Sequence, residues 1–183
     1  MPAAAASARG VLDTLVSLGA THVLGIPDNG SAGLFDLASS DDRLSLLTVT
    51  REGEAFAVAA GLWVGGATPV VVIQGTGLLE SGDSVRGTAI RMGAPMLCLI
   101  GYRGYGKMRR AGIDAGSGPY PPEMLRRADV DSAALLLEPT LKAWGIPHQV
   151  LAPERATEMI QSAWAQAQAE ERPVALLLTS PME

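Results

Sequence analysis

Short apolar runs alternate with longer stretches of helical periodicity along the whole chain. The runs Pro69–Ile73 and Pro95–Ile100 are continuously apolar, which is typical of strands covered on both faces of a sheet. Between such runs, apolar residues recur every three to four positions, which indicates amphipathic helices. The strands that we expect are 22–26, 44–49, 69–73, 95–100, 147–151 and 174–178. The helices that we expect are 3–18, 31–39, one from 52, 75–92, 121–144 and one after Pro153.

This alternation predicts a single domain over residues 1–183, an α/β fold with an open, mostly parallel, Rossmann-like sheet and helices on both faces. In such sheets, ligands bind beyond the carboxyl ends of the strands. We therefore expect one edge of the sheet to carry the segments 27–30, 50–54, 74–78 and 101–110, and 101–120 to be irregular. The helix from residue 52 should bury one face, made of Ala55, Val58, Ala59 and Leu62.

Composition excludes several classes of protein. The net charge of −5 and the aromatic content of 4% argue against a nucleic-acid binder, which normally has a basic face or stacking platforms. Cys98 is the only cysteine, so intramolecular disulfides and multi-cysteine zinc sites are excluded, and its place in a buried strand predicts an inert thiol. We expect a cytoplasmic protein with no membrane association, because neither a signal peptide nor a membrane-spanning run is visible.

Two segments at the expected edge could carry chemistry. Glu52 begins a helix, where its carboxylate could serve catalysis or simply stabilise the helix by about 0.3–1 kcal/mol through the helix dipole. Glu54 is the alternative candidate for the catalytic carboxylate. The segment Gln74–Gly77 follows a strand, and its glycines would let a ligand approach the backbone closely, although a tight turn explains them equally well.

The other two segments are more ambiguous. Asp28 and Asn29 fit an ordinary turn as well as a site. A basic cluster follows the fourth strand and is either a solvated face or a recognition element for an acid group; its members are Arg103, Lys107, Arg109 and Arg110. His22 and His148 lie in expected strands, where a structural role is the simpler interpretation.

Five motifs in order along the chain resemble the thiamine diphosphate-dependent decarboxylases, in particular those of phosphonopyruvate and sulfopyruvate. They are Gly25-Ile26-Pro27-Asp28, Glu52 followed by Ala59-Ala60-Gly61, Ile73-Gln74-Gly75-Thr76-Gly77-Leu78, Ile100-Gly101-Tyr102-Arg103-Gly104 and Trp144-Gly145-Ile146-Pro147. Each motif is weak alone, but together they cover nearly the whole chain. The chain departs from the resemblance after Gly104, at Tyr105–Arg110, which leaves the substrate open.

The resemblance implies a role for each of these residues. Glu52 would hydrogen-bond a ring nitrogen of the cofactor's aminopyrimidine and so promote loss of the thiazolium C2 proton, while the cofactor carries the chemistry. The resemblance further implies that the cofactor is contacted by Gln74, Gly75, Thr76 and Gly77. It makes Asp28 a proton relay, and it assigns Asn29 and Arg103 to a small 2-keto acid substrate.

One part of the family's pattern is missing. Its members hold Mg²⁺ and the diphosphate through a Gly-Asp-Gly segment and a later Asn, which supply hard oxygen ligands. Here the nearest match is Gly82-Asp83-Ser84, and the only Asn, Asn29, precedes it. We therefore expect a separate β subunit to carry that domain, with this chain as the self-associating α subunit of an α2β2 or larger enzyme. The alternatives are a carboligase subunit of the same cofactor class and a non-catalytic regulatory or binding subunit.

Overall fold

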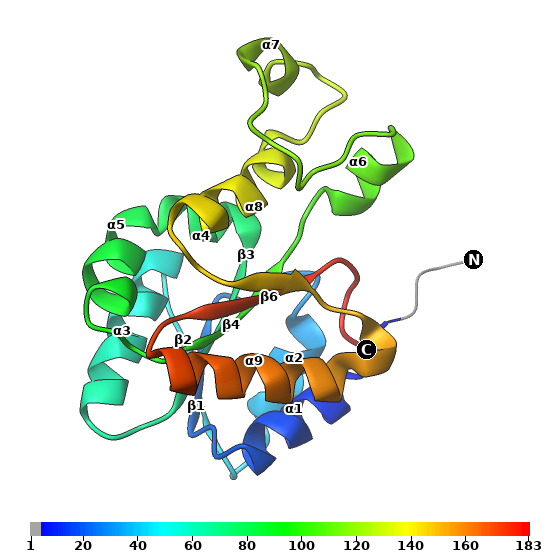
Figure 1. Ribbon diagram of the computed structural model, residues 1–183. Coiled ribbons are helices and arrows are strands. Elements are labelled where there is room, and N and C mark those ends of the chain that lie inside the picture. The colour runs from blue at the N-terminus through cyan, green and yellow to red at the C-terminus, as the bar shows by residue number, and fades with distance from the viewer. Residues whose placement is uncertain (1–4) are drawn as a thin grey trace.

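A six-stranded parallel sheet forms the centre of the molecule in the computed structural model, which describes residues 5–183 (Figure 1). The strand order is β2-β1-β3-β4-β6-β5, and every neighbouring pair is parallel. The strands are β1 (His22–Gly25), β2 (Ser45–Thr48), β3 (Pro69–Gln74), β4 (Leu97–Gly101), β5 (His148–Val150) and β6 (Val174–Leu178). The predicted α/β fold with an open parallel sheet is confirmed.

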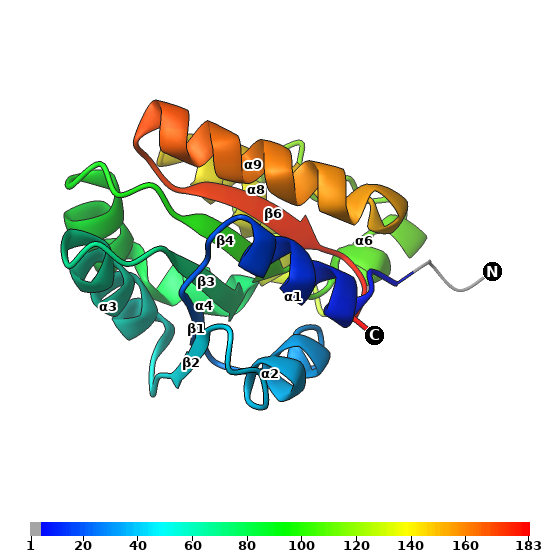
Figure 2. The same ribbon diagram turned by 90° about the horizontal axis from the view of Figure 1, so that it is seen from below.

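Helices cover both faces of this sheet, as Figures 1 and 2 show. One face packs against α1 (Ala8–Ser17), α2 (Ala32–Ala38) and α9 (Ala156–Glu170). The other packs against α3 (Glu52–Val64), α4 (Gly75–Glu80), the π-helix η1 (Val85–Ile90) and α8 (Ser132–Ala143). The short elements are α5 (Gly82–Ser84), α6 (Tyr105–Arg110), α7 (Pro122–Leu125) and the 3-10 helix η2 (Pro153–Arg155).

The central strands are buried on both sides because their residues alternate between two cores. Val71 and Ile73 of β3 point into the core under α3 and α8, and Val70 and Val72 point into the core under α1 and α9. All four are at most 1% exposed. Continuous apolar sequence in these strands is therefore a consequence of helices on both faces.

The helix α3 is rotated relative to the prediction. Val58 was expected to face the sheet with Ala55 and Ala59, but it is 41% exposed. Phe56 and Ala60 are buried in its place. Nearly every position of α3 is apolar, so periodicity alone does not select the buried face, and the larger aromatic ring of Phe56 enters the core.

Four other segments differ from the predictions. The helix expected over 3–18 begins at Ala8, where Ser7 caps it; residues 3 and 4 lie outside the described part. The helix expected over 75–92 is divided into α4, α5 and η1, and the stretch 101–120 contains the helix α6. The helix expected over 121–144 is divided into α7 and α8, because Asp131 caps a new helix.

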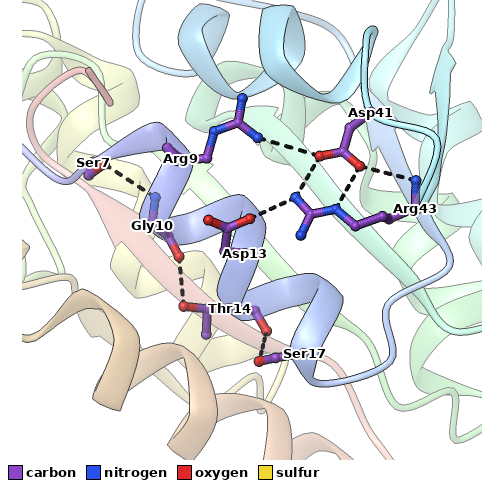
Figure 3. A network of polar contacts seen from close by, with 8 residues as sticks. All are labelled: Ser7, Arg9, Gly10, Asp13, Thr14, Ser17, Asp41 and Arg43. Atoms are coloured by element: carbon purple, nitrogen blue, oxygen red, sulfur yellow. Dashed lines mark hydrogen bonds and ion pairs between the residues drawn. The ribbon is translucent and has the colours of Figure 1, made fainter.

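Polar side chains fasten α1 to the turn between α2 and β2 (Figure 3). The guanidinium of Arg43 lies 2.7 Å from the carboxylate of Asp13 and 2.6 Å from that of Asp41. Arg9 approaches Asp41 from the other side at 3.5 Å. The hydrogen bond that Arg43 donates holds the pKa of Asp41 well below its usual range.

Candidate functional site

The loops that follow β1, β2, β3 and β4 all leave the sheet at one edge, because the strands are parallel. Strand order reverses between β1 and β3: β2 lies on one side of β1, and β3, β4, β6 and β5 continue on the other. A crevice at such a reversal is where open α/β sheets bind ligands. Asp28 follows β1 and Gln74 ends β3, so these two predicted site residues lie at the reversal.

Asp28 and Gln74 are hydrogen-bonded to each other, and this pair connects the first and third loops. The Gln74 Nε2 donates to Asp28 Oδ2 at 3.2 Å, and the Thr76 hydroxyl donates to Gln74 Oε1 at 2.8 Å. The other Asp28 oxygen accepts from the backbone N–H groups of Gly30 and Ser31 and from the Ser31 hydroxyl, at 2.7–3.0 Å. Asp28 is therefore both the anchor of its turn and a member of the site.

Glycines make this close approach possible. A Cβ atom at Gly101 would lie 2.9 Å from Asp28 Oδ2, and one at Gly25 would lie 1.7 Å from the Val72 carbonyl oxygen. A Cβ at Gly75 would lie 3.1 Å from the Leu137 side chain. The Gly101 backbone therefore lets Asp28 approach the end of β4, while Gly25 and Gly75 allow close packing against β3 and α8.

Glu52 lies against the backbone of Gly77 at the start of α4. A Cβ atom on Gly77 would come within 2.3–2.5 Å of the Cγ, Cδ and Oε1 atoms of Glu52. Within residues 5–183 the Glu52 carboxylate forms no hydrogen bond or ion pair, and the residue is half-buried. The fold therefore packs the Glu52 stem tightly and leaves its oxygens available to a ligand.

Glu54 has a different, structural position two residues further on. Its carboxylate accepts hydrogen bonds from the backbone N–H and hydroxyl of Thr50, both at 2.9 Å, and from the backbone N–H of Arg51 at 3.3 Å. These bonds lower the pKa of Glu54, and the bond from the Thr50 N–H has the largest effect. They complete a cap on α3, and all three are accepted by Glu54 Oε2.

A cavity of about 630 Å³ opens at the same edge. Among the predicted site residues, its lining includes Asp28, Asn29, Gln74 and Arg103. It does not include Glu52, Gly75, Thr76 or Gly77; of these four, Thr76 is hydrogen-bonded to the lining residue Gln74. The structure thus brings together four of the eight predicted residues in one cavity and leaves the other four outside its lining.

Sequence reasoning missed part of this lining. Lys107 and Arg110 of α6 line the cavity, although they were treated only as members of a basic cluster. Thr179 and Ser180 line it too, directly after β6. The signal for the last two was available, since residues following any parallel strand of a sheet emerge at its carboxyl edge.

The remaining candidates are structural. Burial raises the pKa of the Cys98 thiol to about 12, so the thiol is not a nucleophile at neutral pH. The His148 Nδ1 donates a hydrogen bond to the Ile146 carbonyl at 2.9 Å, and its Nε2 lies 3.6 Å from Glu138. Glu138 also accepts a hydrogen bond from the Tyr102 hydroxyl, which with burial raises the pKa of Tyr102.

Among the described residues, no group of three or more His, Cys, Asp or Glu side chains is arranged to hold a metal ion. No helix in that part of the chain is long and apolar enough to cross a membrane.

A parallel α/β domain with its site at the topological reversal, and a helix-initiating carboxylate beside it, defines a cofactor-binding class of fold. The chain belongs to the family described as thiamine pyrophosphate enzyme, N-terminal TPP binding domain, whose model matches residues 6–117. The resemblance inferred from the five motifs is thereby confirmed at the level of the family.

Two curated proteins, both phosphonopyruvate decarboxylases, are similar to part of this chain. The phosphonopyruvate decarboxylase of Streptomyces hygroscopicus is 44% identical over 72 residues, which are 39% of this chain and 18% of that protein. The phosphonopyruvate decarboxylase of Streptomyces viridochromogenes is 45% identical over 64 residues, which are 35% of this chain and 16% of that protein. The chain thus matches less than a fifth of the length of these relatives.

A solved structure supports the fold over the whole chain. Benzoylformate decarboxylase from Polynucleobacter necessarius superimposes with a TM-score of 0.65, covering 96% of this chain and 30% of that one. Sequence identity in this comparison is 21%, so the likeness concerns the fold.

Proposed function

We propose that this chain is the α subunit of a hetero-oligomeric, thiamine diphosphate-dependent 2-keto acid decarboxylase that acts on phosphonopyruvate, sulfopyruvate or a close analogue. The observation that carries the proposal is the position of Glu52, the first residue of α3. Its side chain packs against Gly77 of α4, yet its carboxylate forms no hydrogen bond or ion pair within residues 5–183. A charged group left unpaired at the edge of a core indicates a missing partner.

The residues at this edge fit the pyrimidine end of the cofactor. Gly77 lets the Glu52 side chain lie directly against the backbone at the start of α4, and Thr76 is exposed beside it. When bound, thiamine diphosphate would supply the carbon nucleophile and the electron sink for decarboxylation. Glu52 would hold a proton at its carboxylate against a ring nitrogen, and Gln74 would orient Asp28 through their hydrogen bond.

The same residues do not fit the diphosphate and Mg²⁺ end. The described part of the chain arranges no cluster of acidic ligands, and Asn29 is the only Asn in the sequence. We infer that residues outside this domain hold the diphosphate and the metal ion. We place them on a β subunit with a Gly-Asp-Gly segment and a later Asn.

The outer surface of α3 supports association with such a subunit or with a second copy. Apolar residues lie on all sides of α3, so some of them are exposed to solvent. The exposed small or apolar residues are Ala57, Val58, Gly61 and Val64. Val64 is 66% exposed. A helix without a polar face is normally covered on all sides, so the outer surface of α3 is the expected interface.

The substrate assignment has two supports. Part of this chain is 44% and 45% identical to two curated phosphonopyruvate decarboxylases. The cavity at the carboxyl edge of the sheet is lined by Arg103, Asn29 and Asp28, which could bind an anionic keto acid and relay a proton to or from it.

The experiment that tests the proposal measures decarboxylation of phosphonopyruvate and sulfopyruvate by the purified chain, with and without the candidate β subunit, in the presence of thiamine diphosphate and Mg²⁺. We expect activity only in the mixture. Glu52→Gln should reduce kcat by roughly 10²–10⁴-fold, as for loss of a general acid–base group. The matched control Glu54→Gln, two residues away, should keep kcat within a few-fold while weakening the cap of α3.

Other outcomes separate the alternatives. Full activity of the Glu52→Gln mixture would refute a catalytic role and favour a non-catalytic subunit. Release of carbon dioxide together with a carbon–carbon bonded product from an added aldehyde, in place of the free aldehyde product, would identify a carboligase. Activity of this chain alone would refute the dependence on a partner.

A further inference from the structure

Three cationic side chains converge on the cavity at the carboxyl edge of the sheet. Arg103 follows β4, and Lys107 and Arg110 lie on one side of α6, three residues apart. Asp28 is the only carboxylate in the lining. Its oxygens already accept hydrogen bonds from Gln74, Ser31 and Gly30.

These three cations are among the seven of the chain's 14 basic side chains that have no carboxylate partner in the described residues. Elsewhere, seven arginines form ion pairs: Arg9, Arg43, Arg51, Arg86, Arg127, Arg155 and Arg172. In the described residues, Arg103, Lys107 and Arg110 form no ion pair, although acidic side chains outnumber basic ones by 19 to 14. Lys107 attracts Asp129 only at longer range, since that carboxylate is paired with Arg127.

Like charges that face one cavity repel each other unless an anion enters between them. A guanidinium fork and an ammonium together match the several oxygens of a tetrahedral oxyanion such as a phosphonate or sulfonate. Gln74 and Asp28 line the same cavity and are connected through Thr76 to the segment that contacts Glu52. An anion held by α6 would therefore lie beside the proposed reaction centre.

We propose that Lys107 and Arg110 determine substrate specificity by binding the tetrahedral oxyanion at the end of the substrate opposite its keto acid, together with Arg103. This inference rests on the proposed function and assigns α6 the selection of a second acid group. It explains why the chain carries its basic cluster in the stretch where it departs from the motifs of the family, at Tyr105–Arg110.

Arg109 provides a matched control on the same helix. Its guanidinium lies over the Tyr105 ring, 5.9 Å from the ring centre, and it does not line the cavity. Arg109→Gln removes the same charge from the same short helix as Arg110→Gln. A general electrostatic effect of α6 would therefore change both variants equally, whereas direct contact changes only one.

The first experiment measures binding without turnover. The assembled enzyme, or this chain if no partner is found, is titrated by calorimetry with phosphonoacetate, sulfoacetate and propionate. We expect both oxyanions to bind at least tenfold more tightly than propionate, and Lys107→Gln/Arg110→Gln to weaken them by roughly 10- to 100-fold. Arg109→Gln should bind like the unsubstituted protein. A preference for phosphonoacetate over sulfoacetate would identify the phosphonate as the natural group, and the reverse would identify the sulfonate.

The second experiment compares kcat/KM for phosphonopyruvate and pyruvate in the assembled enzyme. Lys107→Gln and Arg110→Gln should each lower kcat/KM for phosphonopyruvate about tenfold, mainly through KM, and leave that for pyruvate within about twofold. Equal losses on both substrates, or equal losses in Arg109→Gln, would overturn the inference while leaving the proposed function intact. If the unsubstituted protein has no decarboxylase activity, the proposed function is refuted. If the double variant of that same protein still loses oxyanion binding, the anion site is upheld.

Discussion

Gly77 is as necessary to the proposed site as Glu52, because the two residues occupy adjoining space. Glu52 begins α3 and Gly77 lies in the first turn of α4, so the contact joins loops that follow β2 and β3. Tight packing of the Glu52 stem against a glycine backbone fixes the carboxylate without using its oxygens. Positioning of this kind is what makes a single carboxylate effective in catalysis.

We predict that Gly77→Ala separates position from chemistry. Its Cβ would lie 2.3 Å from Glu52 Cγ, so Glu52 must move. Because displacement of a catalytic group by about 1 Å can cost roughly 100-fold in rate, kcat of the assembled enzyme should fall by one to two orders of magnitude. Gly87→Ala is the control, since no atom lies within 4 Å of its Cβ position. Unchanged kcat in Gly77→Ala would show that the position of Glu52 is not critical.

The segment between β4 and α8 shows how one element positions another. The Asp131 side chain accepts a hydrogen bond from the Ala134 N–H at 3.1 Å and so starts α8. The same carboxylate packs against Gly104, where a Cβ would lie 2.6 Å from it. Gly104 adopts a φ of +82° directly before α6, a conformation that favours glycine. The helix that carries Lys107 and Arg110 is thus held against the N-cap of α8.

We predict that Asp131→Ala destabilises the chain by about 1 kcal/mol, the usual cost of an N-cap. Asp131→Asn should be close to neutral, because Asn caps helices as well as Asp does. Equilibrium unfolding in urea measures both. A neutral Asp131→Ala would mean that α8 is held by its packing against α4 alone.

At the scale of the whole molecule, arginines hold many surface carboxylates in their charged form. Hydrogen bonds from arginine side chains are the main cause of the lowered pKa of Asp41, Asp129 and Glu158. A pKa lowered in the folded state means that the unfolded chain binds protons more readily at acid pH. These groups therefore stabilise the fold above their ordinary pKa of about 4, and this contribution is lost as the pH falls below it.

We predict that the free energy of unfolding is nearly constant from pH 7 to about 5 and decreases as the pH falls below about 4. Asp41→Asn should lower stability at pH 7 and reduce the dependence on acid, because Asp41 joins Arg43 and Arg9 in the network of Figure 3. Asp42→Asn is the control, since Asp42 is exposed and forms no ion pair within residues 5–183. Thermal unfolding between pH 3 and 7 measures both variants. An equally steep acid dependence in Asp41→Asn would exclude Asp41 as a contributor.

The local pattern of apolar residues was sufficient to predict the strands, the fold class and the edge that bears the site. Runs such as Pro69–Ile73 can be predicted as strands because burial on both faces requires continuous apolar sequence. The place of Glu52 at a helix start could also be predicted, because strand, loop and helix follow each other directly along the chain. The predicted roles of Glu52 and Asp28 stay predictions.

Only the tertiary structure decided which distant residues meet. Asp28 contacts Gln74 because β1 and β3 are neighbours, and Lys107 shares their cavity because α6 turns back over the strand ends. It also decided that Phe56, and not Val58, enters the core. Periodicity reports how a segment alternates between core and solvent, whereas strand order and helix rotation depend on packing between segments far apart in the chain. The fold class was therefore readable from the sequence alone, and the composition of the cavity was not.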